Sequence, residues 1–258
     1  MSRIREAFAN GKAFIPFITG GDPDLNTTER LLYALDEAGA GLIEIGIPFS
    51  DPVAEGPVIE AASERALKGG CTTEMLFDLV ARVRKNIKAP ILFMTYYNPV
   101  FAYGVEKFTG RCAACGIDGL IVPDLPYEER GELLGPCESN GLELISLIAP
   151  TSEERISKIA GNSGGFLYCV SSLGTTGERG DIGNSAKRMI ERAKQAADIP
   201  CAVGFGISTP EQARETAGFA DGVIVGSAIV KIIERYGADC VEPVFRFAKE
   251  MKQAILNI

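Results

Sequence analysis

The chain has 258 residues, of which 46% are hydrophobic, and this is enough for one large domain with a sizeable core. Its 34 acidic residues outnumber its 26 basic ones, and the net charge of −8 argues against binding to nucleic acid or to an anionic membrane surface. Because histidine is absent, a Ser-His-Asp triad, a histidine general base and a histidine metal ligand are all excluded.

The seven cysteines are odd in number and several lie in apolar patterns, which is typical of a reduced, cytoplasmic chain and not of a disulfide framework. Cys112 and Cys115 have the spacing of half a zinc site, but a second cysteine pair and a histidine are missing. We therefore expect no metal site and place both thiols in the core. The N-terminal residues lack the apolar segment of a signal peptide, and no apolar run approaches the ~18 residues that span a bilayer.

Apolar runs alternate with helical patterns along the chain, after a short charged helix at residues 1–8. Strands are predicted at residues 13–18, 42–45, 91–95, 120–122, 142–148, 166–170, 201–205 and 223–225. Helices are predicted at residues 57–67, 73–86, 126–140, 152–160, 227–236 and 241–256. Three more helices are predicted to end near residues 38, 115 and 197, and another is predicted to begin near residue 209. Residues 96–103 and 171–183 are predicted as loops.

Eight strands, each followed by a helix, predict a closed (β/α)8 TIM barrel that forms a single domain over residues 1–258. An N-terminal helix precedes it, and extra helices are expected after strands two and eight. An open, doubly wound sheet is the alternative, but its dinucleotide-binding motif is incomplete because Thr209 stands where the third glycine of the run from Gly204 is needed. The long connections at 44–57 and 171–183 follow barrel strands, where active sites are built.

Glu44 is the unusual residue of this sequence because it lies within the apolar strand 42–45. A buried, unpaired carboxylate carries a large desolvation cost or keeps its proton, and such groups cluster at functional sites. A buried structural ion pair is the alternative interpretation. Glu55 lies in the loop above it, and Asp124 ends the fourth strand, where capping of the following helix is the favoured role. The sequence therefore predicts a site with carboxylates at the barrel mouth.

Three glycine-bearing segments follow strands six, seven and eight, at residues 174–177, 204–206 and 226–227. The last two precede helices directly. Backbone N–H groups at helix N-termini bind phosphate, and phosphate sites of barrels lie after strands seven and eight. A phosphate site held mainly by backbone amides is therefore expected, although the glycines alone also suit turns.

These motifs resemble the tryptophan synthase α chain family. The most specific match is Glu-Ile-Gly-Ile-Pro-Phe-Ser-Asp-Pro, which begins at Glu44. Further matches occur in the same order at residues 16–19, 96–98, 174–177, 204–206 and 226–232, so the resemblance covers nearly the whole chain.

The resemblance implies a carbon–carbon lyase that cleaves indole-3-glycerol phosphate to indole and glyceraldehyde 3-phosphate in a retro-aldol reaction without a cofactor. It implies that Glu44 moves the protons, and the apolar strand around Glu44 supplies a physical reason for the raised pKa that a general acid needs near neutral pH. The second family carboxylate, which holds the indole N–H, matches Glu55. Most members have aspartate there, so the longer side chain puts its reach in doubt but not its charge.

The resemblance also implies the residues that contact the substrate. Aromatic and aliphatic side chains form the wall around the indole, a tyrosine lies beside Glu44, glycines and a serine hold the phosphate, and a threonine belongs to a loop that closes over the site. The expected substrate-binding residues are Phe17, Tyr96, Tyr168, Thr176, Gly177, Phe205, Gly206, Ile224, Gly226 and Ser227.

Members of the family work with a separate β chain that carries pyridoxal phosphate and makes L-tryptophan, so an α2β2 heterotetramer is implied. This chain itself shows no site for that cofactor. The aromatic loop 96–103 suits a partner surface at the barrel mouth, although core packing accounts equally well for some of its aromatics. By resemblance, the residues that face the β chain are Pro48, Asp51, Asn98 and Phe101.

Two other functions stay open. One is a stand-alone lyase that releases indole without a partner. The other is a weakly catalytic binding subunit whose main task is to activate its partner. Glu55, which stands where most family members have aspartate, is the feature that suggests this function. Assays of indole-3-glycerol phosphate cleavage, with and without a β chain, would separate these hypotheses.

Overall fold

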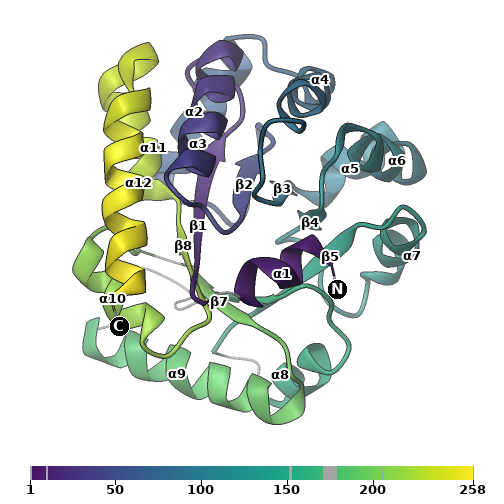
Figure 1. The fold of residues 1–258 in the computed structure, drawn as a ribbon. Coiled ribbons are helices and arrows are strands. Elements are labelled where there is room, and N and C mark those ends of the chain that lie inside the picture. The colour runs from purple at the N-terminus through teal and green to yellow at the C-terminus, as the bar shows by residue number, and fades with distance from the viewer. Residues whose placement is uncertain (1, 10, 151–152, 171–178, 205, 258) are drawn as a thin grey trace.

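Eight parallel strands close into a barrel in the order β1 to β8, as the computed structural model shows (Figure 1). The structure describes residues 2–9, 11–150, 153–170, 179–204 and 206–257. The strands are β1 (Ala13–Thr19), β2 (Ile43–Gly46), β3 (Ile91–Met94), β4 (Gly119–Ile121), β5 (Glu143–Ile148), β6 (Leu167–Val170), β7 (Cys201–Gly204) and β8 (Gly222–Val225). The predicted (β/α)8 barrel is confirmed.

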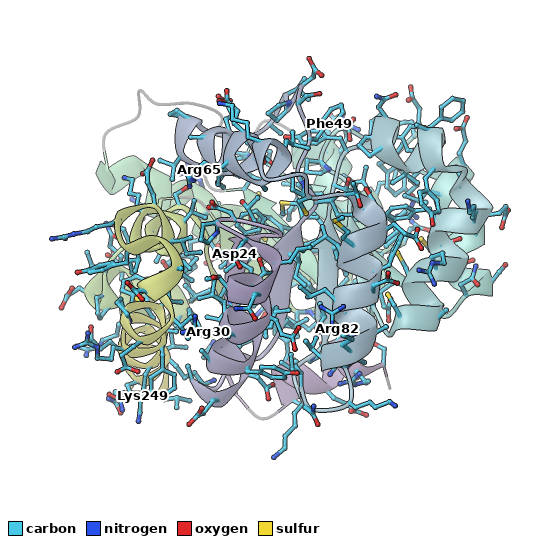
Figure 2. The ribbon with its side chains drawn as sticks, turned by 90° about the horizontal axis from the view of Figure 1, so that it is seen from above. Asp24, Arg30, Phe49, Arg65, Arg82 and Lys249 are labelled. Carbon is cyan, nitrogen blue, oxygen red and sulfur yellow. The ribbon has the colours of Figure 1, made fainter. Side chains whose placement is uncertain are left out.

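Helices surround this barrel, and α2 and α12 lie side by side on its outside, where they carry Arg30 and Lys249 (Figure 2). The first half of the chain contributes α1 (Arg3–Ala9), α2 (Leu25–Glu37), α3 (Pro57–Lys68), α4 (Thr73–Val83), α5 (Tyr97–Tyr103) and α6 (Val105–Cys115). The second half contributes α7 (Gly131–Ser139), α8 (Glu153–Ala160), α9 (Arg179–Ala196), α10 (Pro210–Ala217), α11 (Ser227–Tyr236), a 3-10 turn (Gly237–Asp239) and α12 (Val241–Leu256). The extra helices after β2 and β8 are therefore confirmed, and β3 is also followed by two helices.

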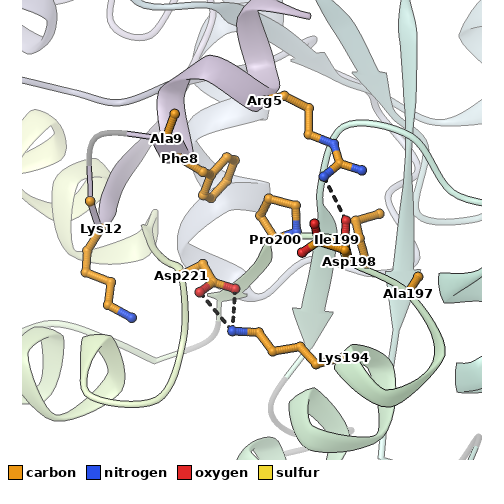
Figure 3. Close-up of a pocket in the computed structure, with 11 residues that line it drawn as sticks. Arg5, Phe8, Ala9, Lys12, Lys194, Ala197, Asp198, Ile199, Pro200 and Asp221 are labelled. Carbon is orange, nitrogen blue, oxygen red and sulfur yellow. Dashed lines mark hydrogen bonds and ion pairs between the residues drawn. The ribbon is translucent and has the colours of Figure 1, made fainter. Parts of the chain in front are cut away.

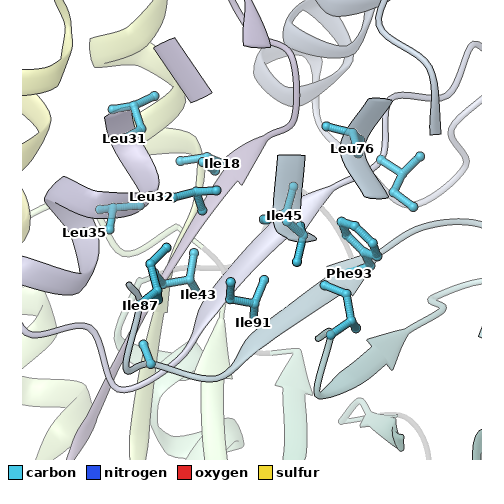
Figure 4. Packing of buried hydrophobic residues seen from close by; sticks show 14 of the residues in the cluster. Ile18, Leu31, Leu32, Leu35, Ile43, Ile45, Leu76, Ile87, Ile91 and Phe93 are labelled. Carbon is cyan, nitrogen blue, oxygen red and sulfur yellow. The ribbon is translucent and has the colours of Figure 1, made fainter. Parts of the chain in front are cut away.

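The sequences of the strands are continuous apolar runs because both faces of each strand are buried. Alternate residues such as Leu92 and Ile224 point into the barrel, while their neighbours point outward to the helices. Figure 4 shows part of the outer layer, in which Ile43 lies near Leu35 of α2 and Phe93 lies near Leu76 of α4. Glu44 lies between two outward-facing isoleucines of β2 and therefore points inward.

Helix α1 covers the N-terminal end of the barrel. Ile4 is fully buried among the inward-facing side chains, and the Phe8 ring lies 5.4 Å from that of Phe166. A Cβ at Gly222 would come within 2.9 Å of the Phe8 ring, so the glycine leaves the space that the ring occupies. The opposite end of the barrel, where the strands end, is left for the candidate site.

Residues 97–103 form helix α5, so the loop predicted at 96–103 is wrong. The Asp124 carboxylate accepts the N–H of Tyr97 at 2.9 Å and satisfies the first turn of α5. Asp124 was expected to cap the helix that follows it, but it caps a helix from the preceding βα unit. Local sequence could not reveal this helix, because its N-terminal partner comes from the end of another strand.

Three other helix boundaries differ from the prediction by three residues or more. Helix α7 begins at Gly131 instead of residue 126, because residues 126–130 form turns. Helix α9 begins at Arg179, so the loop predicted to reach residue 183 is shorter, and its residues 171–178 lie outside the described part. Helix α4 ends at Val83 and not at residue 86.

All seven cysteines are buried free thiols. Cys112 and Cys115 are 0% and 4% exposed, as predicted, and burial raises the pKa of both thiols. Within the described residues, no group of three or more acidic or cysteine side chains is arranged to hold a metal ion. Each described helix is too short or too polar to cross a lipid bilayer.

Candidate active site

Glu44 is fully buried inside the barrel. It lies opposite Phe17 of β1 and Leu92 of β3 in the strand register. Among the described residues, neither of its carboxyl oxygens has a hydrogen-bond partner and no cation pairs with it, so the alternative of a structural ion pair has no support there. Burial raises the pKa of Glu44 to about 8, and the group therefore holds a proton at neutral pH.

Tyr168 of β6 also belongs to the inner face of the barrel. Burial and, secondly, the charge of Glu44 raise the pKa of Tyr168, so the phenol lies within electrostatic range of that carboxyl group. The tyrosine lies over Gly204 of β7, where an added Cβ would come 2.7 Å from the hydroxyl oxygen. The glycine therefore makes room for the phenol in the barrel.

Phe17 is 3% exposed and fills the inner face next to Glu44. A Cβ at Gly46 would approach the Phe17 ring to 2.6 Å, and a Cβ at Gly226 would lie 3.4 Å from it. Ile224, 3% exposed, belongs to the same inner face on β8. Phe17 on the neighbouring strand and Ile224 on the strand beyond it belong to the apolar interior of the barrel, and burial in that interior desolvates Glu44.

Glu55 is half-buried in the loop between β2 and α3. Burial and, to a lesser degree, the charge of Glu60 raise the pKa of Glu55 to about 7, while a hydrogen bond from the Tyr96 hydroxyl opposes the rise. The same hydroxyl accepts the N–H of Ala54 at 3.1 Å, and the Tyr96 ring packs 5.5 Å from that of Phe49. Tyr96 therefore ties this loop to the end of β3 and positions Glu55.

The helices after β7 and β8 differ in how their N-termini are satisfied. Thr209 and Gln212 form a capping box at α10, so side chains of the chain itself occupy those donors. Helix α11 is preceded by Gly226 and has no side-chain cap among the described residues, and Ser227 at its start is exposed. The first N–H groups of α11 are thus available to an anion.

Gly206 lies in the connection between β7 and α10, is exposed, and has a φ of 73°. We expect Gly206→Val to weaken the binding of glycerol 3-phosphate at least about tenfold, because a β-branched residue strains this backbone and places methyl groups where phosphate would approach. Titration calorimetry measures the change. Gly141→Val is the matched control, since Gly141 has a φ of 70° and open space around it but lies at the other end of the barrel, before β5. Equal losses in the two variants would argue against a phosphate site at Gly206.

The structure brings most of the predicted substrate-binding residues to the mouth of the barrel or its inner face. Thr176, Gly177 and Phe205 lie outside the described residues. The sequence prediction omitted Met94 and Leu147, two half-buried side chains on the inner face of β3 and β5. Strict two-residue alternation from Leu92 would have identified Met94.

The predicted partner-facing residues lie on two neighbouring segments at the mouth. Pro48 and Asp51 belong to the connection after β2, and Asp51 is exposed. Asn98 and Phe101 lie on α5, where the Phe101 side chain is 66% exposed. Val53, on the first segment, is 77% exposed, so large apolar side chains reach solvent on both segments.

A closed barrel with a protonated carboxyl group inside it, a second carboxyl group in a mouth loop and an uncapped helix N-terminus defines a (β/α)8-barrel enzyme of the acid–base type. The family model described as "Tryptophan synthase alpha chain" matches residues 4–256. The chain belongs to the tryptophan synthase α chain family.

Individual relatives match this chain over nearly their full length. The tryptophan synthase alpha chain of Lacticaseibacillus casei is 47% identical over 255 residues, which cover 99% of this chain and 96% of that protein. The alpha chain of Citrifermentans bemidjiense is 48% identical over 264 residues, covering 100% and 99%. The crystal structure of tryptophan synthase subunit alpha from Legionella pneumophila has a TM-score of 0.91 at 39% identity and full coverage of both chains. A chain of the Pyrococcus furiosus tryptophan synthase α2β2 complex has a TM-score of 0.87 at 40% identity, covering 94% of this chain and 98% of that one.

Proposed function

We propose that Glu44 transfers the protons and Glu55 stabilises the developing positive charge when this chain cleaves indole-3-glycerol phosphate to indole and glyceraldehyde 3-phosphate. As a member of its family, the chain is a carbon–carbon lyase of tryptophan biosynthesis. The observation that carries the assignment is Glu44, a carboxyl group inside the barrel that has no hydrogen-bond partner among the described residues and has a pKa of about 8. The reaction needs a proton donor for a ring carbon, and Glu44 holds such a proton.

The reaction proceeds in two proton transfers. Protonated Glu44 gives its proton to C3 of the indole ring, and the ring nitrogen becomes positively charged. The Glu44 carboxylate then removes the proton of the adjacent glycerol hydroxyl. The bond between C3 and the glycerol carbon breaks, its electron pair returns to the ring, and the aldehyde forms. Indole and glyceraldehyde 3-phosphate are released, and Glu44 is again protonated.

Glu55 acts on the charge that develops between these transfers. Its carboxylate accepts a hydrogen bond from the ring N–H, which stabilises the positive ring more than the neutral substrate. Phe17, Tyr168 and Ile224 supply the apolar surfaces that hold the indole beside Glu44. The N-terminus of α11 binds the phosphate group at the other end of the substrate.

Steady-state cleavage of indole-3-glycerol phosphate, measured with and without a β chain, tests this function. We expect cleavage by the chain alone and faster cleavage with the partner. Equal rates in the two assays would favour a stand-alone lyase. Activation of a β chain without measurable cleavage in either assay would favour a binding subunit and contradict the catalytic assignment.

The pH dependence of kcat/KM follows from the two raised pKa values. The proposed mechanism needs Glu44 protonated, so the rate falls as pH rises through about 8. It needs Glu55 ionised, so the rate also falls as pH decreases through about 7. We expect a narrow bell-shaped profile in kcat/KM, which reports the groups of the free enzyme. A profile that stays flat between pH 6 and about 9 would contradict both assignments.

The second proposal concerns the partner. The relative from Pyrococcus furiosus forms a tryptophan synthase α2β2 complex. We propose that this chain likewise pairs with a β chain, which carries pyridoxal phosphate, and that Pro48, Asp51, Asn98 and Phe101 face it. The exposed apolar side chain of Phe101 beside the mouth supports this placement. The buried free thiols fit a cytoplasmic complex.

The Phe101→Asp variant is expected to lose at least about tenfold in affinity for a β chain, because it places a charge in an apolar contact. Its basal cleavage activity should change much less. Analytical ultracentrifugation of the mixed chains measures assembly. Leu256→Asp is the control, since Leu256 is 57% exposed at the end of α12, on the other side of the barrel (Figure 1). Assembly of Phe101→Asp as tight as that of this control would refute the placement.

A further inference from the structure

A pocket lies at the N-terminal end of the barrel, away from Glu44 (Figure 3). Helix α1, residues 11–12, the end of α9, residues 197–200 and Asp221 line it, and its volume is about 540 Å3. Pockets for small molecules measure roughly 300–1,000 Å3. These segments all precede strands, so the pocket is separated from the mouth by the filled interior of the barrel.

We call this pocket the base pocket, because it lies at the N-terminal end of the barrel. Its charges favour an anion. Lys194 pairs with the Asp221 carboxylate at 2.9 Å, and Asp221 also accepts the N–H of Cys201 at 2.9 Å, so these two charges neutralise each other. The Lys12 ammonium donates to the Ala220 carbonyl at 2.7 Å, and this is its one hydrogen bond within the part of the chain that the structure describes.

Arg5 donates to the backbone carbonyl of Asp198 at 2.8 Å and not to its carboxylate. Within the described residues, neither Arg5 nor Lys12 has a carboxylate within ion-pair distance. The exposed Asp198 carboxylate is the one acid of the lining that stays unpaired there, so one positive charge remains in excess. A chain with a net charge of −8 thus has a locally cationic pocket.

The middle of the base pocket is apolar. Phe8 and Pro200 both line it and lie between Lys12 and Arg5 in Figure 3. The Phe8 ring is held by its contact with Phe166 at 5.4 Å, so its position does not depend on a ligand. A fixed ring and a proline next to it offer a surface for a flat apolar group.

From this arrangement we propose that the base pocket binds a small, flat organic monocarboxylate. The apolar part of the ligand lies against Phe8 and Pro200, and its carboxylate is attracted by Lys12 on one side of these residues, while Arg5 on the other side adds a longer-range attraction (Figure 3). One negative charge matches the single excess positive charge of the lining, and the two half-buried cations retain free donors toward the pocket.

Benzoate is a suitable probe, and benzamide is its neutral counterpart of the same shape. Calorimetry and backbone NMR shifts should show saturable benzoate binding in the millimolar range or tighter, with shifts at Phe8, Lys12 and Asp221. Benzamide should bind at least about tenfold more weakly. The binding should persist when excess glycerol 3-phosphate occupies the mouth of the barrel. Displacement of benzoate by glycerol 3-phosphate, or no saturable binding, would overturn the proposal.

Two variants test the two parts of the base pocket, one by removing a charge and the other by removing the flat ring. Lys12→Gln keeps an N–H donor for the Ala220 carbonyl, and we expect it to weaken benzoate binding at least about fivefold. Phe8→Leu keeps an apolar contact but removes the flat ring, and should also weaken binding. Lys85→Gln is the matched control, because Lys85 is exposed at the same end of the barrel and outside the pocket. If Lys12→Gln folds and binds benzoate like this control, the charge has no role and the proposal is wrong.

Discussion

The Glu44→Gln variant is expected to fold and to lose roughly 10²–10⁴-fold in kcat, the usual cost of removing a general acid–base group. Glutamine has nearly the same shape, so the contacts with Phe17 and Leu92 persist while the transferable proton is lost. Single-turnover and steady-state rates on indole-3-glycerol phosphate measure the effect. A variant that retains a third of the wild-type kcat would eliminate Glu44 as the proton-transferring group.

A second readout separates proton chemistry from a purely structural role. Burial raises the pKa of Glu44 from 4.5 to about 8, so between these values the folded chain holds a proton that the unfolded chain releases. The free energy of unfolding of the wild type therefore falls as pH rises from about 5 to about 8, by up to about 1.4 kcal/mol for each unit of pKa difference. Glu44→Gln lacks this contribution. Urea unfolding at several pH values should show the difference between the two proteins shrinking or reversing as pH rises.

The Glu55→Ala variant is expected to lose roughly 10²–10³-fold in kcat/KM, comparable to removing one group that stabilises charge in a transition state. Glu55→Asp should stay within roughly tenfold of wild type, since ~1.4 kcal/mol corresponds to a factor of ten. Adjusting a side chain costs only ~0.5–1.5 kcal/mol, whereas losing a hydrogen bond to a charged group costs roughly 1.5–3 kcal/mol. Rotating the carboxylate into place in Glu55→Asp therefore costs less free energy than losing its hydrogen bond in Glu55→Ala.

The structure adds a reason to expect this ranking. Tyr96 binds both Glu55 and the N–H of Ala54, so the loop is held even when residue 55 is shortened. Tyr96→Phe would remove this support, and it serves as a control for loop position. Full activity of Glu55→Ala would show that Glu55 has no catalytic part. A wild type that was itself nearly inactive would then favour the binding-subunit hypothesis.

The sequence alone was sufficient for the architecture. Eight apolar runs separated by helical patterns predicted the barrel, because strand and helix periods are local properties and eight βα units of this length close on themselves. It was also sufficient to single out Glu44, because a lone acid in an apolar strand is visible without any contact. The start of a helix near residue 209 was also predicted from local sequence, and Thr209 and Gln212 cap that helix.

Other features were decided only by contacts between distant segments. Helix α5 depends on Asp124 from the next strand, so residues 97–103 looked like a loop. The shifted pKa values depend on closure of the barrel around Glu44 and on the folding of the loop of Glu55 onto Tyr96. Desolvation and long-range hydrogen bonds arise only when strands far apart in sequence become neighbours.

The base pocket is the clearest example of a feature that the sequence alone did not reveal. Its lining joins α1 to residues 194–200 and to Asp221, and its local charge is opposite in sign to that of the whole chain. Composition reports only the sum of charges, and that sum argued against nucleic acid and anionic membrane surfaces. Where individual charges remain unpaired is decided by tertiary structure, because pairing depends on distances between side chains that lie far apart in the sequence.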